Sequence, residues 1–457
     1  MAENSKERIE KIRLDFKKAS ENSGYTDTSS IGFFKRNILQ LSNAIITSDT
    51  NHFVYRNDKI TNYLNTVLKK IIAGNNQLNK TDFKIYTAQT NEVNAANYSQ
   101  GVLFVNLGII YRCNNEDQLA FVICHEMSHD YMDHVIKGIK KRNEIYNSST
   151  LEKEMSQLSK EKFNRYKRFE EVSKKYLAKY QNTSREYELQ ADSLGLAFLK
   201  NTGYEQTAAY NQLLILDSCD KFYFTTKIPF TKIFNFDDLK FDEEWLKDEE
   251  QTDWGNNVNS LNIPDSLKSH PDAKIRADKL LHSIKVQKTA MGVLKNDFGE
   301  FKKLALYEGL EKYINEGMYC LSLYNSLQLL NETPGQPYLI LNSVRCLIEM
   351  SFFKQHHLSS QIIDIPDKNF PLSYNELLNF INNINDKMAL NLAEQLLKKH
   401  KDIFSIVDPL YGYLESLMEL KKQTSSKNNI IAETYSKKYA DTYYLNELKK
   451  RINLIHD

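Results

Sequence analysis

The residues with the clearest chemical potential form the run His125-Glu126-Met127-Ser128-His129. Two histidines four positions apart lie on one face of an α-helix, about one turn from each other. Both imidazoles can therefore bind a single zinc ion, at bond lengths of about 2.0–2.1 Å. Glu126 follows the first histidine, so its carboxylate lies beside the metal, where it can take a proton from zinc-bound water. The sequence thus predicts a catalytic metal site.

The residues around this run indicate a buried helix. Asn115-Glu116-Asp117 is typical of a helix start, and the segment 118–124 is strongly apolar. Two histidines and a glutamate would be costly in an apolar helix unless they shared a purpose. The alternative is a pair of core histidines that donate to backbone carbonyls. The apolar surroundings favour the metal site over that alternative.

A catalytic zinc also needs a third protein ligand and an open position for water. Three carboxylates lie close together further along the chain, at Glu186, Glu188 and Asp192. Glu188 and Asp192 are four apart, so one can bind zinc while the other accepts a hydrogen bond from the free N–H of a ligand histidine. Glu186 lies in the same turn on another face, and spacing alone does not decide between the candidates.

The elements that must position these residues are mostly helical. Residues 83–86 alternate in polarity and residues 101–106 are apolar and β-branched, so both are predicted strands, with a polar loop over 91–100 between them. Residues 135–183 are rich in mixed charges and are expected to form a solvated helical excursion, with a break near 147–149. Further helices are expected over residues 5–20, 31–48, 58–73 and 184–200.

The later part of the chain divides into a loop-rich segment and a helical region. Residues 221–268 contain Pro, Trp, Asp and Asn and are expected to be mostly loop, whereas residues 286–457 are predicted to be helix after helix. The stretch 307–337 matches a few positions of a tetratricopeptide unit, without a clear second copy. An irregular helical domain is therefore preferred to a helical repeat.

Composition excludes several classes of protein. The chain has 457 residues, of which 41% are hydrophobic and 26% charged, with a net charge of +1. This length suggests two or three domains, and the balanced charge does not predict nucleic acid or an anionic membrane as the main partner. Five scattered cysteines argue against a disulfide framework.

The chain shows no sequence signal for export or membrane insertion. The N-terminus lacks an apolar core for a signal peptide, and no apolar stretch reaches about 18 residues. We therefore expect no transmembrane helix and a cytoplasmic location for the sequence as given. If Met1 takes the place of a removed export signal, the expected location becomes the periplasm or cell envelope.

Four segments together resemble one known family. Residues 125–134 resemble its HExxH helix, residues 188–192 its ExxAD segment, residues 94–105 the strand before the active helix, and residues 270–276 its HPxxxxR segment. These motifs, in this order, resemble the gluzincin zinc metallopeptidases that include the CAAX prenyl proteases, HtpX and BepA. The absence of the membrane spans of some branches points to a soluble branch.

The resemblance implies roles for individual residues. It implies that Glu188, rather than Glu186, is the third zinc ligand and that Asp192 orients a ligand histidine. His270 is expected to gate the fourth zinc position or to stabilise the oxyanion. Arg276 is expected to pair with an acidic residue near the ligand helix, and His134 to support the site from outside the ligand set.

The expected fold is mainly α, of the α+β kind. A metallopeptidase domain over residues 1–285 would carry a small β-sheet beside the HExxH helix, including the insertion 135–183. Residues 286–457 would form an all-helical C-terminal domain, a candidate surface for a protein partner. The resemblance also implies that the edge strand within 94–105 binds substrate backbone by strand addition.

The predicted activity is hydrolysis of peptide bonds in protein or peptide substrates by a zinc-dependent endopeptidase. One Zn²⁺ per chain would be held by His125, His129 and Glu188, with Glu126 as the base. The alternative is a latent or inactive metalloprotease-like protein that acts as a chaperone or interaction module through its helical C-terminal region. An intact Glu126 favours the enzyme, because a structural zinc site has no use for a base there.

Overall fold

The structure is a computed structural model. Apart from the single residues Leu14, Gly32 and Arg36, it describes the chain in nine segments, namely 58–98, 101–146, 148–161, 163–247, 273–284, 296–404, 408–422, 428–439 and 442–456. The helices expected over 5–20 and 31–48 therefore lie outside the described residues. Within those segments the predicted fold class is confirmed, since the protein is mainly helical with one three-stranded sheet.

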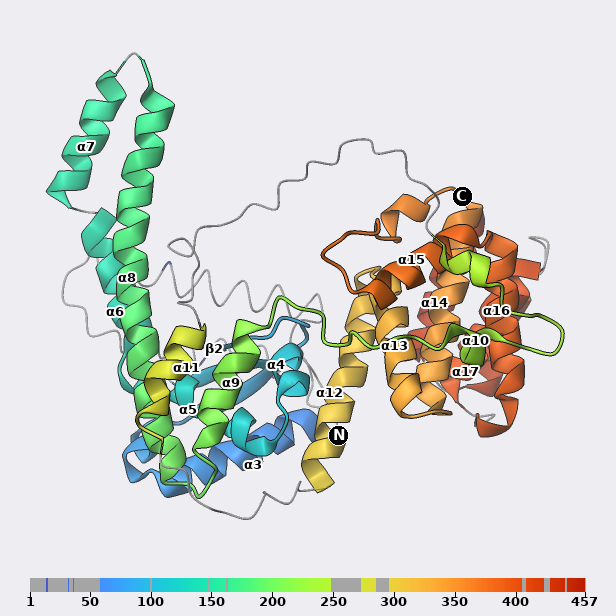
Figure 1. Cartoon of the computed structure of the whole chain (residues 1–457), viewed down its shortest axis with the longest axis horizontal. Helices are drawn as coiled ribbons and strands as arrows, with labels where there is room; N and C mark the ends of the chain where they lie inside the picture. Colours follow the sequence, from blue (N-terminus) through green and yellow to red (C-terminus); the bar gives the residue numbers. More distant parts are fainter. Residues whose placement is uncertain are drawn as a thin grey trace. The chain divides into compact units, whose positions relative to one another are not determined.

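The described residues form two compact units (Figure 1). The first contains the described parts of 58–221 and 273–309, and the second those of 222–247 and 310–456. Each unit is built from two separate stretches of the chain. The sequence instead predicted two domains with a single boundary at residue 285. None of the described helices is both long and apolar enough to cross a membrane.

The first unit combines the sheet with the helices around it. Its strands are β1 (Lys84–Ala88), β2 (Ala95–Asn97) and β3 (Val102–Asn106). Its helices are α3 (Asp58–Gly74), α4 (Leu107–Arg112), α5 (Glu116–Tyr131), α6 (His134–Tyr146), α7 (Ser149–Lys160), α8 (Arg165–Lys200), α9 (Thr207–Asp217), α11 (Ala273–Leu281) and the start of α12 (Asn296–Asn315), with the short 3₁₀ helix η1 (Asn76–Lys80).

The sheet has the order β1-β3-β2. The central strand β3 is buried at every position and runs parallel to β1 and antiparallel to β2. The expectation of a loop throughout 91–100 was wrong, because Ala95–Asn97 pair with β3 as an edge strand. This pairing uses backbone groups, which a short polar sequence does not reveal. The edge strand expected within 94–105 is therefore β2.

Helix α5 lies at the centre of the first unit. Its first turn is capped by the side chain of Asn115, which accepts a hydrogen bond of 3.0 Å from the backbone N–H of Gln118. Every residue from Gln118 to Ser128 is buried, and the helix packs against α3, α8, α9 and β2. A helix enclosed on all sides needs an apolar sequence, which explains the run 118–124.

Helix α8 is much longer than the helix expected over 184–200. It has 36 residues and begins inside the charged segment, at Arg165, where no helix start was expected. The expected break near 147–149 falls between the end of α6 and the start of α7. Helices α7 and α8 lie side by side as a projecting hairpin (Figure 1). The charged segment and a candidate ligand therefore share one helix.

The second unit is helical. It contains α10 (Phe230–Phe234), α13 (Tyr319–Glu332), α14 (Pro337–Gln355), α15 (Leu372–Asn383), α16 (Asp386–Lys399), α17 (Pro409–Lys422), α18 (Asn428–Lys438) and α19 (Thr442–His456), with the short helices η2 (Glu243–Leu246), η4 (Ser359–Gln361) and η5 (Lys401–Ile403). Helix α14 is almost wholly buried and packs against α13, α16 and α17. A protein partner for this unit stays a prediction.

The contact between α5 and α8 depends on a glycine. A Cβ atom at Gly195 of α8 would lie 3.1 Å from both the backbone N and the Cα of His125. These are backbone atoms of the neighbouring helix, so they cannot move aside as the end of a side chain can. The missing side chain thus lets the two helices approach closely beside His125.

We expect Gly195→Ala to lower the free energy of unfolding by about 1–3 kcal/mol, because α5 and α8 must move apart. The matched control is Gly299→Ala in α12, where an added Cβ meets no atom within 4 Å. That change should leave the protein as stable or raise its stability by up to about 1 kcal/mol, since alanine favours a helix. Urea unfolding measures both, and equal effects would contradict the close-approach explanation.

Candidate metal centre

The two histidines of the HExxH run point to the same place from successive turns of α5. Their Nε2 atoms lie 3.1 Å apart, and both side chains are largely buried. Two ring nitrogens at this distance would repel each other if both carried a proton. They can share one proton or bind one cation together.

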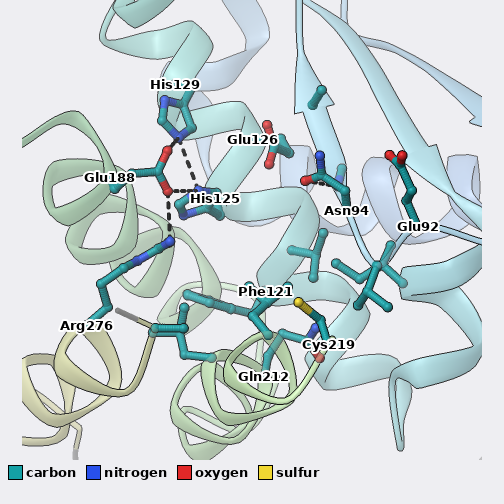
Figure 2. A pocket seen from close by; sticks show the side chains of 18 of the residues that line it. Glu92, Asn94, Phe121, His125, Glu126, His129, Glu188, Gln212, Cys219 and Arg276 are labelled. Atoms are coloured by element: carbon teal, nitrogen blue, oxygen red, sulfur yellow. Dashed lines mark hydrogen bonds and ion pairs between the residues drawn. The ribbon is translucent and has the colours of Figure 1, made fainter. Parts of the chain in front are cut away.

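Glu188 of α8 completes a three-ligand group. Its Oε2 lies 3.5 Å from Nε2 of His125, and its Oε1 lies 3.6 Å from Nε2 of His129 (Figure 2). Ligands bound about 2.1 Å from a tetrahedral zinc ion are about 3.4 Å from each other. The three separations are close to that value, so the group has the size of a zinc site. Glu186 is exposed and is not part of the group.

The electrostatic environment favours positive charge at this point. Burial disfavours a charge on His125, but the carboxylates of Asp192 and Glu188 outweigh it and raise the pKa of His125 well above its usual range. Burial and the nearby charge of His125 lower the pKa of His129. Of two adjacent histidines, one is thus driven to hold a positive charge and the other to stay neutral. The same field would stabilise a bound cation.

Asp192 and Arg276 contact two residues of the ligand group, His125 and Glu188. Oδ1 of Asp192 lies 3.0 Å from Nδ1 of His125, on the side of the ring away from the ligand group. Arg276 of α11 donates to both oxygens of Asp192 at 2.7 Å, and its Nη1 lies 2.9 Å from Oε2 of Glu188. Arg276 therefore pairs with two acidic residues of the ligand helix.

His134 supports the second histidine. Its Nδ1 lies 3.0 Å from Nδ1 of His129, and its Nε2 lies 3.0 Å from Oε1 of Gln190. An amide oxygen can only accept, so His134 donates to it and uses its other nitrogen to accept from His129. The lone pair on Nε2 of His129 then faces Glu188. The ring of His134 also stacks on Tyr187 at 4.3 Å.

Glu126 lies in the same cavity as the three ligands but is not one of them (Figure 2). The cavity measures about 900 Å³. The edge strand β2 borders it on one side. The rest of its lining includes apolar and acidic side chains. The apolar ones are Ile109, Phe121, Val122, Leu213 and Leu216, and the acidic ones are Glu92, Asp217 and Asp220. A polypeptide beside β2 would pass Glu126 and the ligand group.

Sequence reasoning missed two residues that position the site. Asp130 of α5 accepts hydrogen bonds from the backbone N–H of Gly101 at 2.8 Å and from the side chain of Asn97 at 3.3 Å, which ties the β2–β3 turn to the helix. Gln190 orients His134 as described above. Asp130 directly follows His129, and Gln190 lies between Glu188 and Asp192. Their roles become visible only from their contacts in the folded structure.

The residues named from the sequence are mostly brought together. His125, Glu126, His129, Glu188 and Arg276 line one cavity, and Asp192 and His134 contact its ligands. His270, the remaining residue named from the sequence, lies outside the described residues.

We expect Arg276→Met to destabilise the fold by about 3–5 kcal/mol, because it leaves two buried carboxylates without their cation. Burial opposes ionisation of Asp192, but hydrogen bonds from Arg276 outweigh it and hold its pKa below the usual range. Asp192 thus contributes stability that is lost as pH falls through this lowered pKa. In the variant, burial without this cation raises the pKa of Asp192, so this acid-dependent loss of stability should become smaller.

Thermal unfolding measured across acidic pH tests this expectation. Lys279→Met is the matched control, since it removes a positive charge from an exposed position of the same helix. Its unfolding curve should match that of the unaltered protein. A similar loss of stability in both variants would show that overall charge, rather than the buried pairing, is responsible.

Two comparisons relate this chain to known proteins. A model of peptidase family M48 matches residues 58–284, which include every ligand-group residue and Arg276. A beta-barrel assembly-enhancing protease of Yersinia pestis is 26% identical over 86 residues. That match covers 19% of this chain and 18% of the relative, so it spans less than a fifth of either protein. Over residues 58–284, just under half of its length, this chain therefore matches peptidase family M48.

Proposed function

We propose that this protein is a zinc-dependent endopeptidase that hydrolyses peptide bonds of protein substrates. The observation that carries the proposal is the ligand group of His125, His129 and Glu188, whose separations of 3.1–3.6 Å suit one tetrahedral ion. Two imidazoles and one carboxylate leave a fourth position for water, as in catalytic rather than structural zinc sites. The match of residues 58–284 to a peptidase family supports the same activity.

The residues of the chain have separate tasks in the proposed reaction. Zinc, when bound, supplies a Lewis acid that makes water more acidic and polarises the scissile carbonyl. Glu126 takes a proton from the attacking water and passes it to the leaving amine. Asp192 and His134 hold the two ligand rings in orientation. His270 is proposed to stabilise the negative charge that develops on the carbonyl oxygen.

Substrate is proposed to bind along the edge strand. Strand β2 pairs with β3 on one side, and residues 94–97 border the cavity. An extended peptide can add to the other side of β2 through backbone hydrogen bonds. Such binding reads little side-chain information, so unfolded segments of many proteins would fit. The anchoring of Asn97 by Asp130 keeps the strand in place relative to Glu126.

We expect Glu126→Gln to retain the metal and lose proteolysis by at least about 100-fold, because the glutamine cannot accept the proton. The measurement is cleavage of casein or a quenched fluorescent peptide, together with metal content by atomic emission. Glu186→Gln, two residues from Glu188 in the same turn and exposed, is the control and should retain full activity. Full activity in the Glu126 variant would refute the mechanism.

We expect the purified protein to contain about one zinc per chain and to lose both zinc and activity in a chelator. Since zinc binds only the folded chain, its removal should also lower the unfolding temperature. Glu188→Gln should bind zinc more weakly, whereas Glu186→Gln should bind it normally. Tightly held zinc without turnover of any unfolded substrate would instead favour the chaperone or interaction role.

A further inference from the structure

The tip of the α7–α8 hairpin exposes aromatic side chains. Phe163 is 85% exposed, Tyr166 82% and Phe169 46%, and all three lie at or just after the turn that joins the helices. The turn forms through Asn164, whose left-handed backbone (φ 58°) reverses the chain before α8 begins. Large exposed aromatic groups gathered at one place are a feature of interaction sites.

Positive charge is concentrated at the same tip. The described residues between 160 and 169 include four basic residues and one acidic residue, in a chain whose total net charge is only +1. The one glutamate, Glu161, is paired with Arg168 at 3.2 Å. Lys160, Arg165 and Lys167 form no ion pair with any described residue and are exposed. The tip thus presents unpaired positive charge beside the aromatic rings.

The stem below the tip is different. There the charges are mixed and pair with each other, as in Lys174 with Glu170 and Lys175 with Glu154, both at 2.6 Å. A partner that lay along the hairpin would meet these acidic residues, whereas one that met only its end would not. The charge distribution therefore fits a surface approached end-on.

We propose that this tip docks the protein onto the surface of an anionic lipid membrane. Aromatic rings at the level of the lipid headgroups, with lysine and arginine beside them, are the composition that binds peripheral proteins to anionic bilayers. The tip ends a projecting hairpin (Figure 1). Proteins that track a nucleic acid strand instead line a long groove with positive charge. The proposal does not depend on the protease activity.

Docking at the tip would fix the working distance of the metal centre. Helix α8 continues without interruption from Arg165 to Lys200 and carries Glu188. Tyr166 and Glu188 are 22 residues apart, so they are separated by about 33 Å along the helix axis. A docked protein would therefore act on chains within about that distance of the lipid surface.

The experiment is flotation of the full-length protein with lipid vesicles. Phosphatidylcholine vesicles containing phosphatidylglycerol should carry the protein upward, and pure phosphatidylcholine vesicles should not. High salt should weaken binding, because part of the attraction is electrostatic. The paired substitutions Phe163→Ser and Tyr166→Ser, or Arg165→Glu and Lys167→Glu, should each reduce binding by on the order of tenfold or more.

A matched control removes exposed apolar groups elsewhere. Ile365 and Leu372 of the second unit are 64% and 76% exposed, so Ile365→Ser with Leu372→Ser changes similar surface and should leave vesicle binding unchanged. As a gain of signal, tryptophan emission of Phe163→Trp should shift to shorter wavelength with anionic vesicles only. Cleavage of a soluble peptide should be the same in all tip variants, which separates this proposal from the catalytic one.

Several outcomes would overturn the proposal. One is equal flotation of the tip variants and the control, and another is absence of flotation with anionic vesicles. A third is retention by single-stranded or duplex DNA that depends on the tip while the vesicles bind nothing, which would indicate a nucleic-acid surface. An unshifted tryptophan signal in protein that floats would mean that another region makes the lipid contact.

Discussion

The buried charges between α5, α8 and α11 are the constraint on which the rest of the site depends. Asp192, Glu188 and Arg276 are almost fully enclosed, and isolated charges in such a place would be strongly unfavourable. Each finds an opposite charge within 3 Å, so the three helices must meet in one arrangement. That arrangement aims both ligand histidines at Glu188. The charge pairing of the core thereby brings together three side chains that could hold a cation.

The sequence revealed most of the site because the chemistry is local to two helices. The spacing of His125 and His129 fixes a shared helical face, and the apolar run before them indicated burial. The choice between Glu186 and Glu188 needed either a resemblance or the structure, since both lie in one turn. The structure leaves Glu186 exposed and brings Glu188 to the histidines, because α8 turns that face toward α5.

Contacts between distant segments were harder to foresee. Strand β2 is three residues long and pairs through its backbone, so its side chains gave little signal. Similarly, Gln190 and Asp130 look like ordinary polar residues of a helix, and only the neighbours that folding brings to them show their purpose. The overall charge also gives no information on local charge, since an average near zero conceals a strongly basic stretch after α7. Net charge describes the whole chain, whereas a binding partner contacts only one part of its surface.

Because α8 is one continuous helix, the distance between the hairpin end and the candidate site can change without altering the residues of the site. The last four turns of α8 pack against α5, with α11 and α3 as further neighbours of the helix, and Gly195 and Glu188 leave little freedom to vary there. Residues 165–176 stand beside α7 with mostly exposed side chains, which tolerate change far better. Lengthening both helices together by whole turns would move the hairpin end outward without disturbing the ligands. The stem can thus serve as an adjustable spacer, set by evolution or by design, on an otherwise fixed hydrolytic core.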